Sequence, residues 1–264
     1  MFTSRDAGTP RAPSLPSLFL AHVRLVARLG WVELCVFMVA TWLLCGWAAS
    51  LVRGVPAHSY IDRQLGMHFM ALVFAAYWPL AVWRDEAPRQ RSYFWSLPLR
   101  RDHGTLVRVL AGLGVLLIAT VVANAGGFLI GAAIGRAAEF RNVSPLAWLA
   151  SGLGVTIVYL FASTIAVASD VPGRWILALA CLVYAPPLML PLPETLTFAI
   201  RPGPTWLYQG ALGFDRATRF AVTQAQLDSR LSEFTPDQWL PASLVWLVVG
   251  AVFLWLAAQR RIDL

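Results

Sequence analysis

The distribution of charge along the chain is the feature that most constrains its fold. All 21 basic and 14 acidic residues fall outside six long stretches, each with at least 19 consecutive uncharged residues. An α-helix needs about 20 apolar residues to cross the hydrocarbon core of a bilayer, where a buried charge is costly. Six membrane-spanning helices are therefore predicted. Their expected bounds are about 34–52, 64–83, 106–135, 144–169, 175–193 and 239–259.

The composition supports a membrane protein built only from helices. Apolar residues make up 58% of the chain and charged residues 13%, whereas soluble domains carry about 25% charged residues. The uncharged stretches are continuously apolar, and barrel strands would instead alternate in polarity. The predicted fold is an all-α integral membrane protein, with residues 1–32 forming a cytoplasmic tail and interfacial helix and residues 33–264 forming the six-span domain.

The basic residues exclude two functions. All of them are arginine, and a P-loop needs a lysine to reach the nucleotide phosphates, so this chain is not itself a P-loop ATPase. The net charge of +7 does not indicate nucleic acid, because the arginines flank apolar stretches instead of forming a basic patch on a polar domain. We expect them to face anionic lipid of the bilayer.

The arginines also predict an orientation. If the N terminus is cytoplasmic, the inner segments hold 13 arginines and the outer segments hold 8. Positive residues favour the cytoplasmic side, so both termini are predicted to be cytoplasmic.

The segment 15–30 has the pattern of an amphipathic helix. Arg24 and Arg28 lie one turn apart, opposite apolar residues at helical spacing. This favours a helix in the headgroup plane, and the alternative is a short cytoplasmic extension of the first span. The apolar positions are Phe19, Val23, Val26 and Leu29.

The connection between the second and third predicted spans combines charge with aromatic residues. A helix from Gln90 to Leu97 is expected to end there, because Pro98 restricts the residue before it. Aromatic and arginine side chains together are typical of protein interfaces. Both an interface with a partner and a membrane-surface anchor fit this pattern.

Segment 94–101 reads Phe-Trp-Ser-Leu-Pro-Leu-Arg-Arg and is followed by a long glycine-rich span. It resembles the loop of ABC type-2 permeases, in which a charged stretch leads into a Leu-Pro-Val-Ser-Arg-like motif between spans two and three. That family also has six spans, an N-terminal interfacial helix and cytoplasmic termini, so the resemblance covers nearly the whole chain. Leu99-Arg100 stands here where the family often has Val-Ser.

The resemblance implies the membrane subunit of an ATP-driven exporter in the bacterial inner membrane. Two copies, or this chain and a homologue, would form the translocation pathway. The chain itself would bind no cofactor and catalyse no reaction, because ATP and Mg would be held by a separate nucleotide-binding ATPase subunit. The resemblance assigns docking on that subunit to a coupling helix at 90–101. The expected docking residues are Ser92, Tyr93, Phe94, Trp95, Ser96, Leu97, Pro98, Arg100 and Arg101.

Small and polar residues inside the spans have two interpretations each. Gly127, Gly131 and Gly135 share one face of the third span, which suits close helix packing, either static or shifting during transport. Asn124 either bonds across helices or lines a pathway. His68 in the second span is either a packed neutral imidazole or a proton or substrate site.

Prolines break the fifth span near its outer end, and the connection from Glu194 to Asp237 follows. This connection contains a predicted amphipathic helix beginning at Asp215, with Phe220, Leu227 and other apolar residues on one face. We expect it to lie on the external membrane surface, as a cap over an exit path or as a simple surface lid.

Catalytic patterns are missing from the sequence. The four histidines show no metal-ligand spacing, so no metal site is predicted, and no serine-hydrolase motif occurs. No span carries paired carboxylates, so ion-coupled transport lacks its usual groups. The alternatives to a transport subunit are an intramembrane enzyme and a non-transporting membrane scaffold or assembly factor.

Overall fold

The computed structural model describes residues 15–51, 60–84, 101–133, 145–184, 214 and 236–260. Within these ranges the regular elements are α-helices and no strand occurs, which confirms the all-α prediction. The helices are α1 (Leu15–Leu29), α2 (Trp31–Leu51), α3 (Tyr60–Val82), α5 (Arg101–Ala133), α7 (Pro145–Ala168), α8 (Pro172–Tyr184) and α12 (Pro236–Arg260).

Proline marks the start of three helices. Pro145, Pro172 and Pro236 are the first residues of α7, α8 and α12. Proline suits this position because its fixed φ matches the helix and its missing N–H would have no intrahelical acceptor there. The uncharged stretches thus predict where the helices lie, and the prolines refine where three of them begin.

Several helices are long and apolar enough to cross a membrane. Among the described residues, this holds for Gly104–Ala133, Trp148–Ala168 and Trp239–Arg260 individually. Helices α1 and α2 are also long and apolar enough if they are taken together as one bent segment. The apolar part of α3, Met70–Val82, is shorter. This is the architecture of a multi-pass membrane protein. The count of six spans stays a prediction, since α8 has 13 residues and its continuation to residue 193 lies outside the described ranges.

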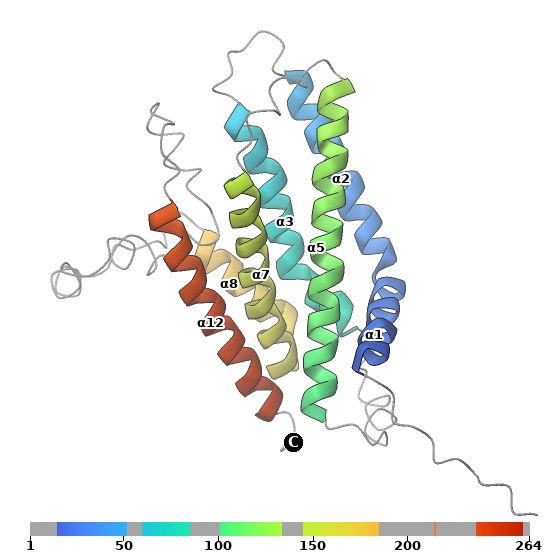
Figure 1. The fold of residues 1–264 in the computed structure, drawn as a ribbon, viewed down its shortest axis with the longest axis vertical. Helices are drawn as coiled ribbons and strands as arrows, with labels where there is room; N and C mark the ends of the chain where they lie inside the picture. Colours follow the sequence, from blue (N-terminus) through green and yellow to red (C-terminus); the bar gives the residue numbers. More distant parts are fainter. Residues whose placement is uncertain are drawn as a thin grey trace, which may run out of the picture.

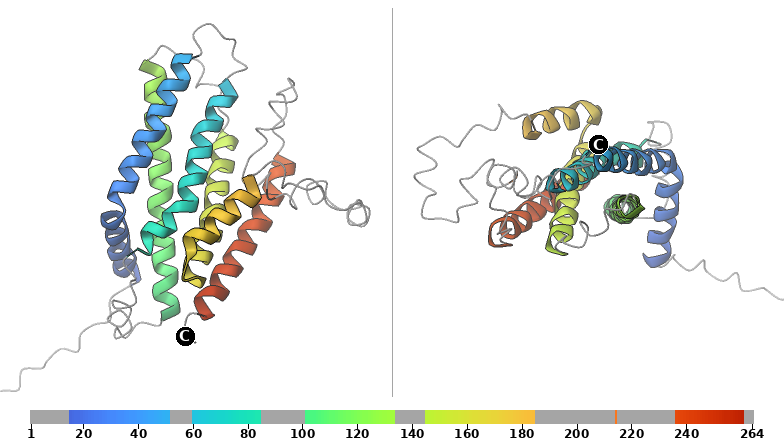
Figure 2. Two further views of the ribbon diagram at one scale, coloured as in Figure 1. Left: turned by 180° about the vertical axis from the view of Figure 1, so that it is seen from behind. Right: turned by 90° about the horizontal axis from the view of Figure 1, so that it is seen from above.

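The long helices alternate in direction along the chain (Figures 1 and 2). Helices α2, α5 and α8 run one way, and α3, α7 and α12 run back. Consequently α1, the end of α3, the start of α5 and the end of α12 lie at the same end of the bundle. We call this the arginine end, because α1, α3, α5, α8 and α12 bring described arginines to it. These are Arg24, Arg28, Arg84, Arg101, Arg108, Arg174 and Arg260.

Helix α1 lies across the bundle. It makes an angle of 66° with α2 at a break around Gly30, and in the view from above it is seen along its length while α5 is seen end-on (Figure 2). The buried Val26 of α1 packs in the core, whereas Arg24 and Arg28 are exposed. The predicted apolar face is thus borne out in part, since Val23 and Leu29 are half-buried beside Val26 but Phe19 is 40% exposed.

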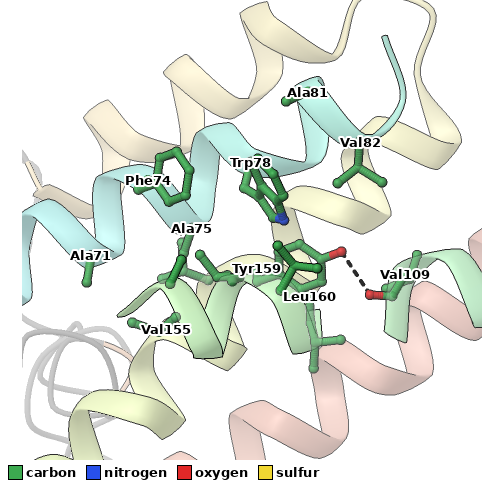
Figure 3. Close-up of a cluster of buried hydrophobic side chains, with 14 of the residues drawn as sticks. Ala71, Phe74, Ala75, Trp78, Ala81, Val82, Val109, Val155, Tyr159 and Leu160 are labelled. Atoms are coloured by element: carbon green, nitrogen blue, oxygen red, sulfur yellow. Dashed lines mark hydrogen bonds between the residues drawn. The ribbon is translucent and has the colours of Figure 1, made fainter. Parts of the chain in front are cut away.

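The core lies where α3, α5 and α7 meet (Figure 3). Trp78, Ala75, Leu116 and Tyr159 are fully buried there. The outer faces of α2, α5 and α12 expose large apolar side chains such as Leu129, as expected for surfaces that face lipid. Apolar contact alone does not drive helices together in lipid, so close packing and interhelical hydrogen bonds must hold this bundle.

Candidate functional site

The connection predicted to dock an ATPase, residues 85–100, lies outside the described residues. This includes Ser92 through Arg100, and Arg101 is the first residue of α5 with its side chain also undescribed. The structure does describe the helix ends on both sides of this connection, at Arg84 and Arg101. The candidate site is therefore the set of contacts that holds these two helix ends in the bundle.

The end of α3 is tied to the start of α2. The turn after α3 is closed by backbone bonds from Trp83 N to the Pro79 carbonyl at 3.0 Å and from Arg84 N to the Ala81 carbonyl at 3.4 Å. The Arg84 guanidinium then forms an ion pair with Glu33 in the first turn of α2. A carboxylate is also favourable there because the positive end of the helix dipole lies nearby.

The end of α3 is tied to α5 by a buried arginine. Arg108 lies about two turns into α5 and is 6% exposed. Its Nη2 donates a hydrogen bond of 2.5 Å to the carbonyl of Val82, the last residue of α3. Its guanidinium carbon also lies 4.7 Å from the ring centroid of Trp83. One side chain thus satisfies a carbonyl at a helix end and makes a cation–π contact.

The Arg84 and Arg108 contacts differ in the stability they are expected to contribute. The Arg84 side chain is 56% exposed, and ion pairs of this kind contribute about 0–1 kcal/mol. Arg108 is buried, and hydrogen bonds from charged groups contribute about 1.5–3 kcal/mol. The cation–π contact adds about 2 kcal/mol where the groups are desolvated. Removing the Arg108 guanidinium is therefore expected to weaken the attachment of the end of α3 more than removing that of Arg84.

Two aromatic donors hold the same part of α5 from other helices. Trp78 Nε1 on α3 donates to the Gly112 carbonyl at 2.9 Å. Tyr159 on α7 donates through its hydroxyl to the Val109 carbonyl at 2.9 Å (Figure 3). Glycine is needed at residue 112, because a Cβ there would collide with the Tyr159 hydroxyl. The first turns of α5 are thus fixed to α3 and α7 by specific hydrogen bonds.

The small and polar residues predicted to pack helices or line a pathway are only partly described. Gly127 and Gly131 are buried on α5, and Gly135 lies outside the described residues. Asn124 is half-buried on α5, and His68 lies in α3 with its side chain undescribed. Their roles in packing or transport stay predictions.

Helix α2 packs closely against α5 at Gly126, a glycine outside the predicted set Gly127, Gly131 and Gly135. A Cβ on Gly126 would collide with the indole of Trp42 on α2, and Trp42 Nε1 donates to the Ala123 carbonyl at 3.1 Å. The sequence gives no signal for this contact, because it depends on how α2 is rotated against α5.

Four threonine hydroxyls within the described helices are satisfied by their own backbone. Each of four threonines donates to the carbonyl four residues earlier, at 2.7–2.9 Å. The helix backbone thus supplies an acceptor for each of these hydroxyl protons, which lipid could not do. They are Thr41, Thr120, Thr156 and Thr164.

One residue of the connection between α8 and α12 reaches into the bundle. Phe214 is buried and packs edge-on against Trp246 at 4.9 Å between centroids and against Phe161 at 5.7 Å. Apart from Pro236 and Asp237, which begin α12, it is the part of the predicted external segment that the structure describes. The predicted helix from Asp215 lies outside the described residues. Phe214 thus attaches this connection to α7 and α12.

No protein-family profile, curated protein or solved structure matches this chain. Within the described part of the chain, no group of three or more histidine, cysteine, aspartate or glutamate side chains could hold a metal ion.

Proposed function

We propose that this chain is the membrane subunit of an ATP-driven exporter of the ABC type-2 permease kind. It crosses the bacterial inner membrane six times with both termini in the cytoplasm. The residues 90–101 dock on a separate ATPase subunit, and two copies of the chain, or the chain and a homologue, form the pathway. ATP and Mg bind to the partner.

The observation that carries this proposal is the attachment of the helix ends around the connection 85–100. Arg108 joins the end of α3 to α5, and Arg84 joins it to α2. A segment that only anchors the chain to the membrane surface does not require its flanking helix ends to be held together. A docking segment that must move those helices does require it. The end of α3 and the start of α5 lie at the arginine end, together with α1 and the end of α12, which adds support.

Affinity purification tests this proposal. The tagged chain, purified from its native membrane in mild detergent, is expected to retain a P-loop ATPase. Trp95→Ala and Leu97→Asp are expected to lose most of the retained ATPase and its turnover, because they remove apolar contacts from the docking surface. Trp175→Ala is the matched control, since Trp175 is 60% exposed near the start of α8 at the same end of the bundle.

Two outcomes would contradict the proposal. One is that no ATPase is retained by the wild-type chain. The other is that docking and ATP turnover are unchanged in both variants of the connection. Retention of other membrane proteins without an ATPase would favour a scaffold.

A further inference from the structure

Arg108 contacts both sides of the connection 85–100. It belongs to α5, the helix that follows the connection, and it binds the last residue of α3 and the residue after it, which precede the connection. Its Nη2 donates to the Val82 carbonyl at 2.5 Å, and its guanidinium lies over the Trp83 ring. A single side chain therefore links the two helix ends that flank this connection.

We propose that Arg108 is a positioning residue, which makes α3 and α5 respond together when the connection is displaced. The inference rests on the proposed function, because it assumes that an ATPase displaces this connection. If the ends of α3 and α5 moved separately, a displacement of the connection would bend the connection instead of shifting the helices.

The chemistry of the contact requires arginine. The Val82 carbonyl, on the last residue of α3, lies at the negative end of the helix dipole and has no intrahelical donor. A guanidinium offers several donors in one plane and a flat face that stacks on an indole, whereas a lysine ammonium offers a point charge. Arg108 uses both properties, on Val82 and on Trp83.

The contact is continuous with the core beyond it. One turn after Arg108, Gly112 accepts the indole N–H of Trp78 from α3. Arg108 and Trp78 thus join α3 to α5 at two successive levels, and both are buried. Displacement of the connection is passed to the interior through these two contacts.

The test measures whether ATP on the partner changes the far end of the bundle. Spin labels are placed at Leu129 on α5 and Leu149 on α7, which are 68% and 52% exposed, after Cys35, Cys45 and Cys181 are replaced by serine. The chain and its retained ATPase are studied in nanodiscs, with ATP and vanadate added. The distance between labels is expected to shift in the otherwise wild-type complex and to lose that shift in Arg108→Gln, while the ATPase stays bound.

Conservative and matched variants separate positioning from general loss of packing. Arg108→Lys is expected to keep part of the shift in label distance. Trp83→Leu, which removes only the cation–π contact of Arg108, is also expected to keep part of it. Trp83→Leu replaces Arg108→Gln as the test variant if Arg108→Gln does not fold. Thr120→Val is the matched control, because Thr120 is as buried as Arg108 and lies on the same helix, and the substitution removes a hydrogen bond within α5, to the Leu116 carbonyl, about three turns from Arg108. It is expected to keep the full shift.

Failure of the proposed role of Arg108 can be distinguished from failure of the proposed function. A full shift in Arg108→Gln or in Trp83→Leu, or an equal loss in Thr120→Val, overturns the role of Arg108 while leaving the proposed function in place. A wild-type chain that retains no ATPase, or a wild-type complex without any ATP-dependent shift, overturns the proposed function and this inference with it.

Discussion

The indole N–H of Trp78 donates to the backbone carbonyl of Gly112 across the contact between α3 and α5, at 2.9 Å. The far edge of the same ring lies against Gly30, at the break between α1 and α2. Trp78 is fully buried, so one side chain joins the transverse helix α1, the start of α2 and the two helices that flank the connection 85–100. The stability of this end of the bundle is expected to depend on it.

Trp78→Phe is expected to lower the free energy of unfolding by about 1–2 kcal/mol, because the Gly112 carbonyl loses a buried donor and part of the ring volume is lost. The measurement is the unfolding midpoint in SDS–detergent mixed micelles. Trp255→Phe is the control, since Trp255 on α12 is 50% exposed and its replacement should change little. Equal effects of the two substitutions would contradict the prediction.

Gly30→Ala is expected to destabilise the protein by about 1–3 kcal/mol, because the new Cβ would collide with the Trp78 ring, which is buried and hydrogen-bonded. Gly152→Ala on α7 meets nothing within 4 Å and should instead stabilise by about 0.5–1 kcal/mol, the usual gain of alanine over glycine in a helix. The same unfolding assay compares the two. A stabilised Gly30→Ala variant would contradict the prediction, because it would show that the Trp78 ring can move aside at little cost in free energy.

Phe214→Ala is expected to cost about 3 kcal/mol, because it empties a buried aromatic site and removes edge-to-face contacts with Phe161 and Trp246. Phe214→Leu should cost less, since it keeps most of the apolar volume. The unfolding assay applies here too, with Leu256→Ala on the exposed face of α12 as the control. If Phe214→Ala behaves like this control, Phe214 does not attach the connection to the bundle.

Cysteine labelling tests the predicted orientation. In a variant without the native cysteines, a cysteine at Arg28 or Gln259 is expected to react with a membrane-impermeant maleimide only in inside-out vesicles. A cysteine at Ser59, in the first predicted outer connection, should react only in intact right-side-out spheroplasts. These positions test whether α1 and the end of α12 share the cytoplasmic side. Labelling of the cysteines introduced at positions 28 and 59 from the same side of the membrane would contradict the predicted topology.

The helices agree closely with the uncharged stretches. The predicted span 144–169 corresponds to α7 (Pro145–Ala168), and 34–52 corresponds to α2 (Trp31–Leu51). The candidate site was less predictable. Arg108 is the one charge within the predicted span 106–135, and a charge inside a span is a signal for a specific partner. Its partners, Val82 and Trp83, could not be read from the sequence, because they belong to another helix.

The sequence by itself determined where the described helices lie, because the cost of placing a charge in lipid is local and depends on each residue in turn. Only the tertiary structure decided that Arg108 binds the end of α3, that Trp78 lies against Gly30, and that Phe214 enters the bundle. These contacts depend on how each helix is rotated and shifted against its neighbours. That arrangement comes from the packing of the whole bundle and not from any single segment.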